Sequence, residues 1–208
     1  MSKRYWRPRR AVRELSQRDP RFAELVKAVG RPSVELREST FETVARAIAY
    51  QQLAGAAASA IWARVSSLFP DGEAIDPGAF LRKRDATYRN MGLSRAKTKS
   101  IKDLARHVTR GDFDPGDFCN RSDDEVVTAL TRVWGIGQWS AQMHLIFSLG
   151  RLDVWPVLDL GVRHGWGKFQ REQSPTAKDL LPLGDRYRPY RSVLAWYMWR
   201  VHDVEDWY

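Results

Sequence analysis

The sequence has 208 residues, of which 43% are hydrophobic and 12% aromatic, so the composition excludes general disorder and allows one large domain or two interleaved halves. Its 34 Lys and Arg residues outnumber 25 Asp and Glu residues and give a formal charge of +9, which favours a polyanionic partner because each phosphate contact releases condensed counterions. A basic protein that has no nucleic-acid partner is the alternative.

Cysteine content and hydropathy indicate the compartment. The single cysteine, Cys119, excludes an internal disulfide, a cysteine-bound iron–sulfur cluster and a zinc finger built from several cysteines. No apolar run is long enough to span a membrane, and the start, MSKRYWRPRR, lacks the apolar core of a signal peptide. We therefore expect a cytoplasmic protein, associated with the nucleoid if the source is bacterial, that has no membrane partner.

Arginines crowd the first segment of the chain. They occupy positions 4, 7, 9, 10 and 13, around Tyr5 and Trp6. Two interpretations stay open, a loose arm that lies on phosphates and a solvated tail, and the tail is the default for a charged terminus.

From Ser39 onward, apolar residues recur at helical spacing, and local signals mark helix ends. A Ser and a Glu three residues apart form a capping box, Pro favours the first helical turn, and Gly ends helices. The expected boundaries are a capping box of Ser39 and Glu42, an interruption at Gly55, a start at Asp76 and Pro77, an end at Gly111, a capping box of Ser122 and Glu125, an end at Gly150 and a last start at Pro189. No segment shows the sustained alternation of a strand, so the chain is predicted to be all-α.

Two glycines lie in the turn expected between the helices on either side of residues 130–141. Gly135 and Gly137 flank Ile136 and permit backbone torsions that side chains forbid. They also let a phosphate approach the N–H groups at the start of the next helix, where partial positive charge collects. An ordinary tight turn is the alternative for an isolated glycine pair.

Several motifs in a fixed order give that glycine pair its context. They are Tyr50-Gln-Gln-Leu-Ala-Gly55, Gly92-Leu-Ser-Arg-Ala-Lys97, Val133-Trp-Gly-Ile-Gly-Gln-Trp-Ser-Ala141, Asp153-Val-Trp-Pro-Val-Leu-Asp-Leu-Gly161, Arg188-Pro-Tyr-Arg-Ser192 and Trp196-Tyr-Met-Trp199. In these motifs the chain resembles the helix-hairpin-helix DNA glycosylases, and within that superfamily it is most similar to the DNA-3-methyladenine glycosylase II branch.

The resemblance implies a two-lobed, all-α helix-hairpin-helix DNA glycosylase fold with the active cleft between the lobes. One lobe would hold approximately residues 36–150, including the helix-hairpin-helix at 122–150, and the other approximately residues 1–35 and 151–208. The hairpin residues implied to bind phosphate are Gly135, Ile136, Gly137, Gln138 and Ser140. The backbone carbonyls implied to hold a monovalent cation, Na⁺ or K⁺, are those of Thr131, Val133 and Ile136, with a bound water or no ligand at all as the alternatives.

Asp159 matches the position of the catalytic aspartate in the family. Read alone, an Asp before an expected helix is usually an N-cap, and the two roles are compatible because helix N–H groups stabilise an ionised carboxylate. Cleavage of a base–sugar bond leaves positive charge on the sugar, which a fixed carboxylate stabilises while it orients or deprotonates the attacking water. Asp153 is the competing carboxylate, and we interpret it as structural.

Superfamily members that also nick the strand carry a nucleophilic lysine just after the hairpin. Here that position is Trp139. Without the amine no Schiff base with the sugar can form. The sequence therefore predicts a glycosylase without AP lyase activity, which leaves an intact abasic strand.

Aromatic residues are expected to surround a base that has been flipped out of the duplex. The resemblance places Trp199 as the stacking residue, with Trp196 and Trp139 nearby and Met143 where some relatives have a second aromatic residue. An electron-rich ring favours a cationic alkylpurine over a neutral base by about 0.5–2 kcal/mol.

The family match also assigns a wedge that fills the gap left by the flipped base. Leu53 matches the intercalating position and Gln52 lies beside it, and apolar wedges of this kind unstack base steps. A core leucine is the alternative for Leu53. Lys97 and Lys99 either bind phosphate or form a solvated helix face.

Together these residues predict a monofunctional DNA glycosylase of base excision repair that removes alkylated purines of the 3-methyladenine and 7-methylguanine type. We expect a monomer that acts on double-stranded DNA and needs no cofactor for catalysis, and the resemblance separately implies a monovalent cation at the hairpin. The alternatives are a glycosylase for oxidised or mismatched bases, a non-catalytic helix-hairpin-helix DNA-binding protein and a helical RNA-binding protein, although no stacking-sheet motif supports the last.

Overall fold

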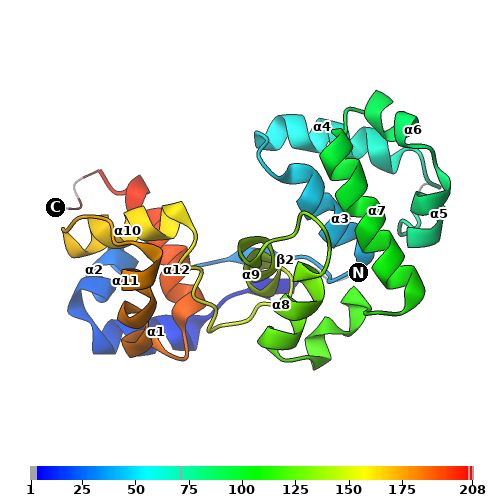
Figure 1. Ribbon diagram of the computed structural model, residues 1–208. Helices are drawn as coiled ribbons and strands as arrows, with labels where there is room; N and C mark the ends of the chain where they lie inside the picture. The colour runs from blue at the N-terminus through cyan, green and yellow to red at the C-terminus, as the bar shows by residue number, and fades with distance from the viewer. Residues whose placement is uncertain (1–3, 71, 206, 208) are drawn as a thin grey trace. The chain divides into compact units, whose positions relative to one another are not determined.

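The computed structural model describes residues 4–70, 72–205 and 207 (Figure 1). Helices dominate these residues, which confirms the predicted all-α class. The described residues also contain a short antiparallel pair, β1 (Arg4–Trp6) and β2 (Val34–Leu36), in which Trp6 lies opposite Val34. None of the helices in the described part of the chain is long and apolar enough to span a bilayer.

The chain divides into two compact units. One unit contains the described residues up to Leu36 together with those from Leu145 onward, and we call it the terminal unit. The other, the central unit, is Arg37–His144. The second boundary falls within helix α9, so that helix contributes residues to both units.

The central unit is a bundle of helices around an aromatic core. Its helices are α3 (Phe41–Tyr50), α4 (Gly55–Ser66), α5 (Pro77–Arg82), α6 (Asp85–Asn90), α7 (Arg95–Arg110), the 3₁₀ helix η1 (Pro115–Asn120), α8 (Asp123–Thr131) and most of α9 (Gln138–Phe147). The long helix α7 packs against α3 and α5 (Figure 1). Phe80 lies at the centre, stacked on Tyr88 at 4.2 Å and on Phe69 at 5.9 Å between ring centroids.

The terminal unit combines the first two helices with the last ones. Its helices are α1 (Arg9–Arg18), α2 (Pro20–Val29), α10 (Leu160–Gln170), α11 (Ala177–Leu183), the 3₁₀ helices η2 (Asp185–Tyr187) and η3 (Val201–Asp203), and α12 (Arg191–Arg200). Gly165 lets α10 and α12 pack closely, because a Cβ there would lie 1.9 Å from the Met198 carbonyl oxygen.

The arginine-rich segment is folded, so neither a loose arm nor a solvated tail describes it from residue 4 onward. Trp6 is buried in the core of the terminal unit, and α1 buries Val12 and Leu15. The arginines alternate with apolar residues at helical spacing, which a count of charges overlooks. Residues 1–3 of the start interpreted above lie outside the described residues.

Most helix boundaries follow their local signals. Ser122 and Glu125 form the predicted capping box, Asp76 accepts the Ala79 N–H at the start of α5, and Gly111 ends α7 with a φ of +76°. These predictions are confirmed because each depends on contacts within one turn.

Three boundary predictions were wrong. Thr40, not Ser39, caps α3, because the Ser39 hydroxyl binds elsewhere in the central unit. Helix α9 ends at Phe147 rather than at Gly150, and α12 begins at Arg191 rather than at Pro189. Only at the end of α9 does the periodic pattern extend beyond the hydrogen-bonded helix.

Candidate active site and candidate DNA-binding hairpin

Asp159 is the N-cap of α10 in the terminal unit. Its Oδ1 accepts the Val162 N–H at 2.8 Å, and its backbone carbonyl accepts the Arg163 N–H. The side chain is half-buried. The predicted position at the start of a helix is confirmed, and the positive end of α10 stabilises negative charge on this carboxylate.

Trp199, on α12, donates a second hydrogen bond to the same carboxylate. Its indole Nε1 lies 2.9 Å from Asp159 Oδ1, across 40 residues of sequence. The indole ring also stacks on Phe147, with 5.7 Å between centroids and an interplanar angle of 30°. The structure therefore brings two predicted site residues together, and it adds Phe147, which the sequence reasoning missed.

Gly161 provides the room for this contact. A Cβ at this position would lie 2.9 Å from Cδ1 of Trp199 and 3.1 Å from Asp159 Oδ1. The spacing of Gly161, Gly165 and Gly167 within one helix was a signal that sequence reasoning could have used. Each glycine costs about 1 kcal/mol relative to alanine in a helix interior, so a run of them indicates close packing.

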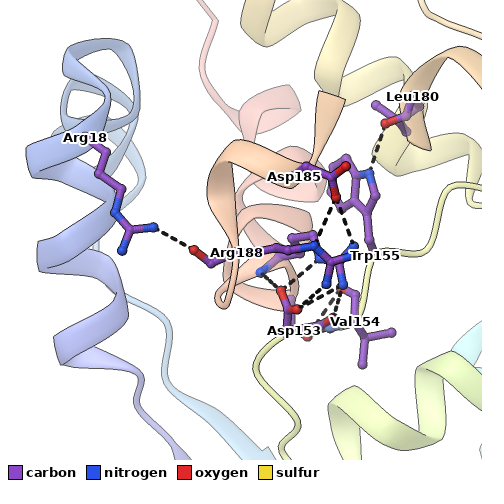
Figure 2. A network of polar contacts seen from close by, with 9 residues as sticks. Arg18, Asp153, Val154, Trp155, Leu180, Asp185 and Arg188 are labelled. Carbon is purple, nitrogen blue, oxygen red and sulfur yellow. Dashed lines mark hydrogen bonds and ion pairs between the residues drawn. The ribbon is translucent and has the colours of Figure 1, made fainter. Parts of the chain in front are cut away.

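Asp153 has the structural role that the sequence analysis gave it. Its carboxylate accepts hydrogen bonds from Arg188 at 2.9 Å and from the Arg191 Nε at 2.8 Å (Figure 2). In the same network Arg18 of α1 donates to the Arg188 carbonyl. These contacts hold the segment before α12 against the rest of the terminal unit.

The two-glycine hairpin lies in the central unit, between α8 and α9. Gly135 has a φ of +86°, which favours glycine, and a Cβ there would also lie close to the Ser100 hydroxyl oxygen, at 3.0 Å. A Cβ at Gly137 would meet nothing within 4 Å. This glycine immediately precedes α9, where Gln138 and Ser140 form the first turn.

Gln51 ties the hairpin to the end of α3. Its side-chain amide donates to the Gly135 carbonyl and to the Ser140 hydroxyl, both at 3.3 Å. The next residues form the turn that carries the predicted wedge. Gln52 has a φ of +55°, and Leu53 is 40% exposed, which excludes the alternative of a core leucine.

A cavity of about 260 Å³ lies within the central unit, between α3 and α9. Trp139 and Met143, two of the predicted base-pocket residues, line it together with Ile48 and His144. Trp139 is 42% exposed. The other two predicted pocket residues, Trp199 and Trp196, belong to the terminal unit, where both pack against its core.

The remaining predicted positions have defined surroundings. The ammonium of Lys97 donates to the Ala49 carbonyl at the end of α3, and that of Lys99 lies 4.1 Å from the ring centroid of Trp134. Of the carbonyls implied to hold a cation, that of Val133 accepts the Ile136 N–H at 3.0 Å, which leaves it a second lone pair. The chain between Thr131 and Gln138 is non-helical, so it can turn carbonyls toward a ligand.

Comparison with known proteins identifies the family. The model of the HhH-GPD superfamily of base excision DNA repair proteins matches residues 45–183. DNA-3-methyladenine glycosylase 1 of Schizosaccharomyces pombe is 34% identical over 92% of this chain and 86% of its own length. The chain therefore belongs to the HhH-GPD superfamily.

Solved structures agree with this assignment. The 3-methyladenine DNA glycosylase of Schizosaccharomyces pombe in complex with abasic DNA is similar with a TM-score of 0.83 and 33% identity, over 95% of this chain and 98% of that chain. The DNA-3-methyladenine glycosidase of Bacillus halodurans also gives a TM-score of 0.83, with 32% identity over 95% of this chain and 91% of that chain.

Proposed function

We propose that this chain is a monofunctional DNA glycosylase of base excision repair, which hydrolyses the N-glycosidic bond of alkylated purines in double-stranded DNA. The observation that carries the proposal is the Asp159 carboxylate, which the start of α10 and the indole of Trp199 hold in one orientation. The named activities of the relatives at 30% identity or more support the choice of alkylated purines.

The chemistry needs one well-placed carboxylate. As the bond between sugar and base breaks, positive charge develops on the sugar, and the Asp159 carboxylate stabilises it. The same group orients the attacking water or accepts its proton. A purine alkylated at N3 or N7 is already cationic, so it leaves without a general acid.

The absence of AP lyase activity is part of the proposal. The indole of Trp139 occupies the position after the hairpin where a lysine would be needed for a Schiff base. Borohydride treatment should therefore trap no covalent adduct between the protein and abasic DNA. A trapped adduct would contradict this part of the proposal and leave the glycosylase activity standing.

The central unit supplies the binding to DNA. The hairpin glycines and the first turn of α9 bind a phosphate, with a monovalent cation held by the carbonyls of residues 131, 133 and 136, and Leu53 fills the gap left by the flipped base. The formal charge of +9 supports a DNA partner. We place the protein as a monomer in the cytoplasm, on nucleoid DNA if the source is bacterial.

Release of bases from methylated duplex DNA tests the function directly. The wild type should release 3-methyladenine and 7-methylguanine, and Asp159→Asn should lower the rate by about 10³-fold while it keeps the N-cap and the affinity for DNA. Asp153→Asn is the comparison at a structural carboxylate, and its effect should appear in stability. Unchanged release by Asp159→Asn would remove the catalytic assignment and leave a DNA-binding protein.

A further inference from the structure

His144 is a buried titratable residue for which the proposed mechanism has no role. It is 7% exposed, and it lies on α9 beside Met143, on the wall of the cavity between α3 and α9. Most of the cavity surface is apolar, and the polar residues that line it besides His144 are Arg37, Tyr50, Gln51, Gln52 and Ser140. The polar groups on a mostly apolar wall determine which ligand it accepts.

Ser39 fixes the tautomer of this imidazole. The Ser39 hydroxyl donates to the Pro115 carbonyl at 2.5 Å, and a carbonyl oxygen can only accept. The same hydroxyl oxygen lies 2.8 Å from His144 Nε2. Because the single hydroxyl hydrogen is already used, Nε2 must carry the proton and donate to Ser39.

The opposite nitrogen is therefore an acceptor. Burial lowers the pKa of the His144 imidazole to about 4, so the ring is neutral at physiological pH and Nδ1 keeps its lone pair. The ring of Phe118 packs edge-on against the imidazole, 5.9 Å between centroids, and holds it in place. Ser39, Pro115 and Phe118 together hold the imidazole in one orientation.

We propose that His144 is a specificity-determining residue whose Nδ1 accepts a hydrogen bond from the 6-amino group of a flipped alkyladenine. The inference rests on the proposed function, and it adds that alkylated adenines are preferred over alkylated guanines within the alkylated purines. An alkylguanine presents a carbonyl oxygen at the same ring position. Two acceptors then face each other without a proton, which is unfavourable in a buried site.

One assay on methylated DNA measures both bases at once. The measured quantity is the release rate of 3-methyladenine divided by that of 7-methylguanine. This ratio is compared between each variant and the wild type. His144→Leu should lower this ratio by about tenfold, the contribution of one buried hydrogen bond. His144→Asn, which retains an acceptor near the place of Nδ1, should keep most of the ratio. His202→Leu, at an exposed histidine in the terminal unit, is the matched control and should leave the ratio unchanged.

The outcomes separate this inference from the function on which it rests. If the wild type releases both bases and His144→Leu leaves the ratio unchanged, the inference is overturned while the proposed function stands, and His144 has a packing role. Release of neither base by wild type overturns the proposed function. Should His144→Leu fail to fold, Ser39→Ala decides the question, because it frees the tautomer: a lower ratio supports the inference and an unchanged ratio overturns it.

Discussion

The carboxylate site in the terminal unit and the proposed DNA-binding features in the central unit are built in different ways. Asp159 is fixed by two hydrogen bonds and by glycines that bring α10 and α12 into close contact. Leu53, Trp134 and Trp139 instead stand on or beside turns, and each is at least 40% exposed. The Asp159 carboxylate is held by the packing of the fold, whereas these exposed side chains project from it.

This difference predicts which substitutions will change the stability of the fold and which will change only the interaction with the ligand. A change near Asp159 disturbs packing and chemistry together, because the same contacts serve both. A change at an exposed turn residue removes an interaction with the ligand and leaves the folded state nearly intact. The predictions below test this contrast, from the largest expected effect to the smallest.

Gly165→Ala should destabilise the terminal unit by about 3 kcal/mol or more, because the new Cβ would overlap the Met198 carbonyl oxygen. Chemical denaturation followed by tryptophan fluorescence measures the free energy of unfolding. Gly55→Ala is the matched control, since nothing lies within 4 Å of its Cβ position. Equal stability of the two variants would refute the close packing of α10 and α12.

Trp199→Phe should lower the rate of base release by about 10- to 100-fold, the cost of losing one hydrogen bond to a charged group. The aromatic ring stays, so the affinity for DNA should change little. Single-turnover kinetics gives the rate, and Trp155→Phe, which removes an indole N–H that is bonded to the Leu180 carbonyl instead, is the control. An unchanged rate for Trp199→Phe would mean that the indole N–H does not orient the carboxylate.

His144 should make the stability of the central unit depend on pH. The pKa of His144 in the folded state is about 4, below the ordinary value of 6.5. The contribution of its neutral imidazole to the free energy of unfolding is therefore complete above pH 6.5 and is lost as the pH falls toward 4. We expect the free energy of unfolding to fall by about 2 kcal/mol between pH 7 and pH 5 from this group. Denaturation of His144→Leu over the same range should show a shallower slope, and equal slopes would contradict a neutral buried imidazole.

Leu53→Ala should leave stability within about 0.5 kcal/mol, because the side chain is largely exposed. Base release from a fully paired duplex should fall by about tenfold, since the apolar wedge is gone, and release from a mismatched site should fall less because unpairing costs less there. A large loss of stability with no preference between the two substrates would show that Leu53 supports the fold instead.

Local signals explain how much of the fold was predictable from the sequence. The capping box at Ser122 and the helix start at Asp159 involve atoms within one helical turn, so residue type and spacing suffice. Ser39 had the same spacing relative to Glu42, yet its hydroxyl binds Pro115, which is 76 residues away. Because the Ser39 hydroxyl binds a partner that is distant in sequence, it does not form the local capping box.

The same reason limits what could be predicted about the site. The resemblance supplied Asp159 and Trp199 as separate positions, but the hydrogen bond between them spans 40 residues and follows from the packing of α10 on α12. The contacts of Phe147 and His144 likewise depend on residues distant in sequence. Periodicity gives the face of a helix, and only the folded chain shows which side chains meet there.

Asp159 also caps α10, so in the proposed mechanism one oxygen atom serves both folding and catalysis. Asparagine can still accept the Val162 N–H, whereas alanine cannot, so the difference between these two variants isolates what that atom contributes to folding. The rate lost in asparagine then measures what the carboxylate contributes besides this capping bond. The two substitutions together separate the contribution of Asp159 to stability from its contribution to reactivity.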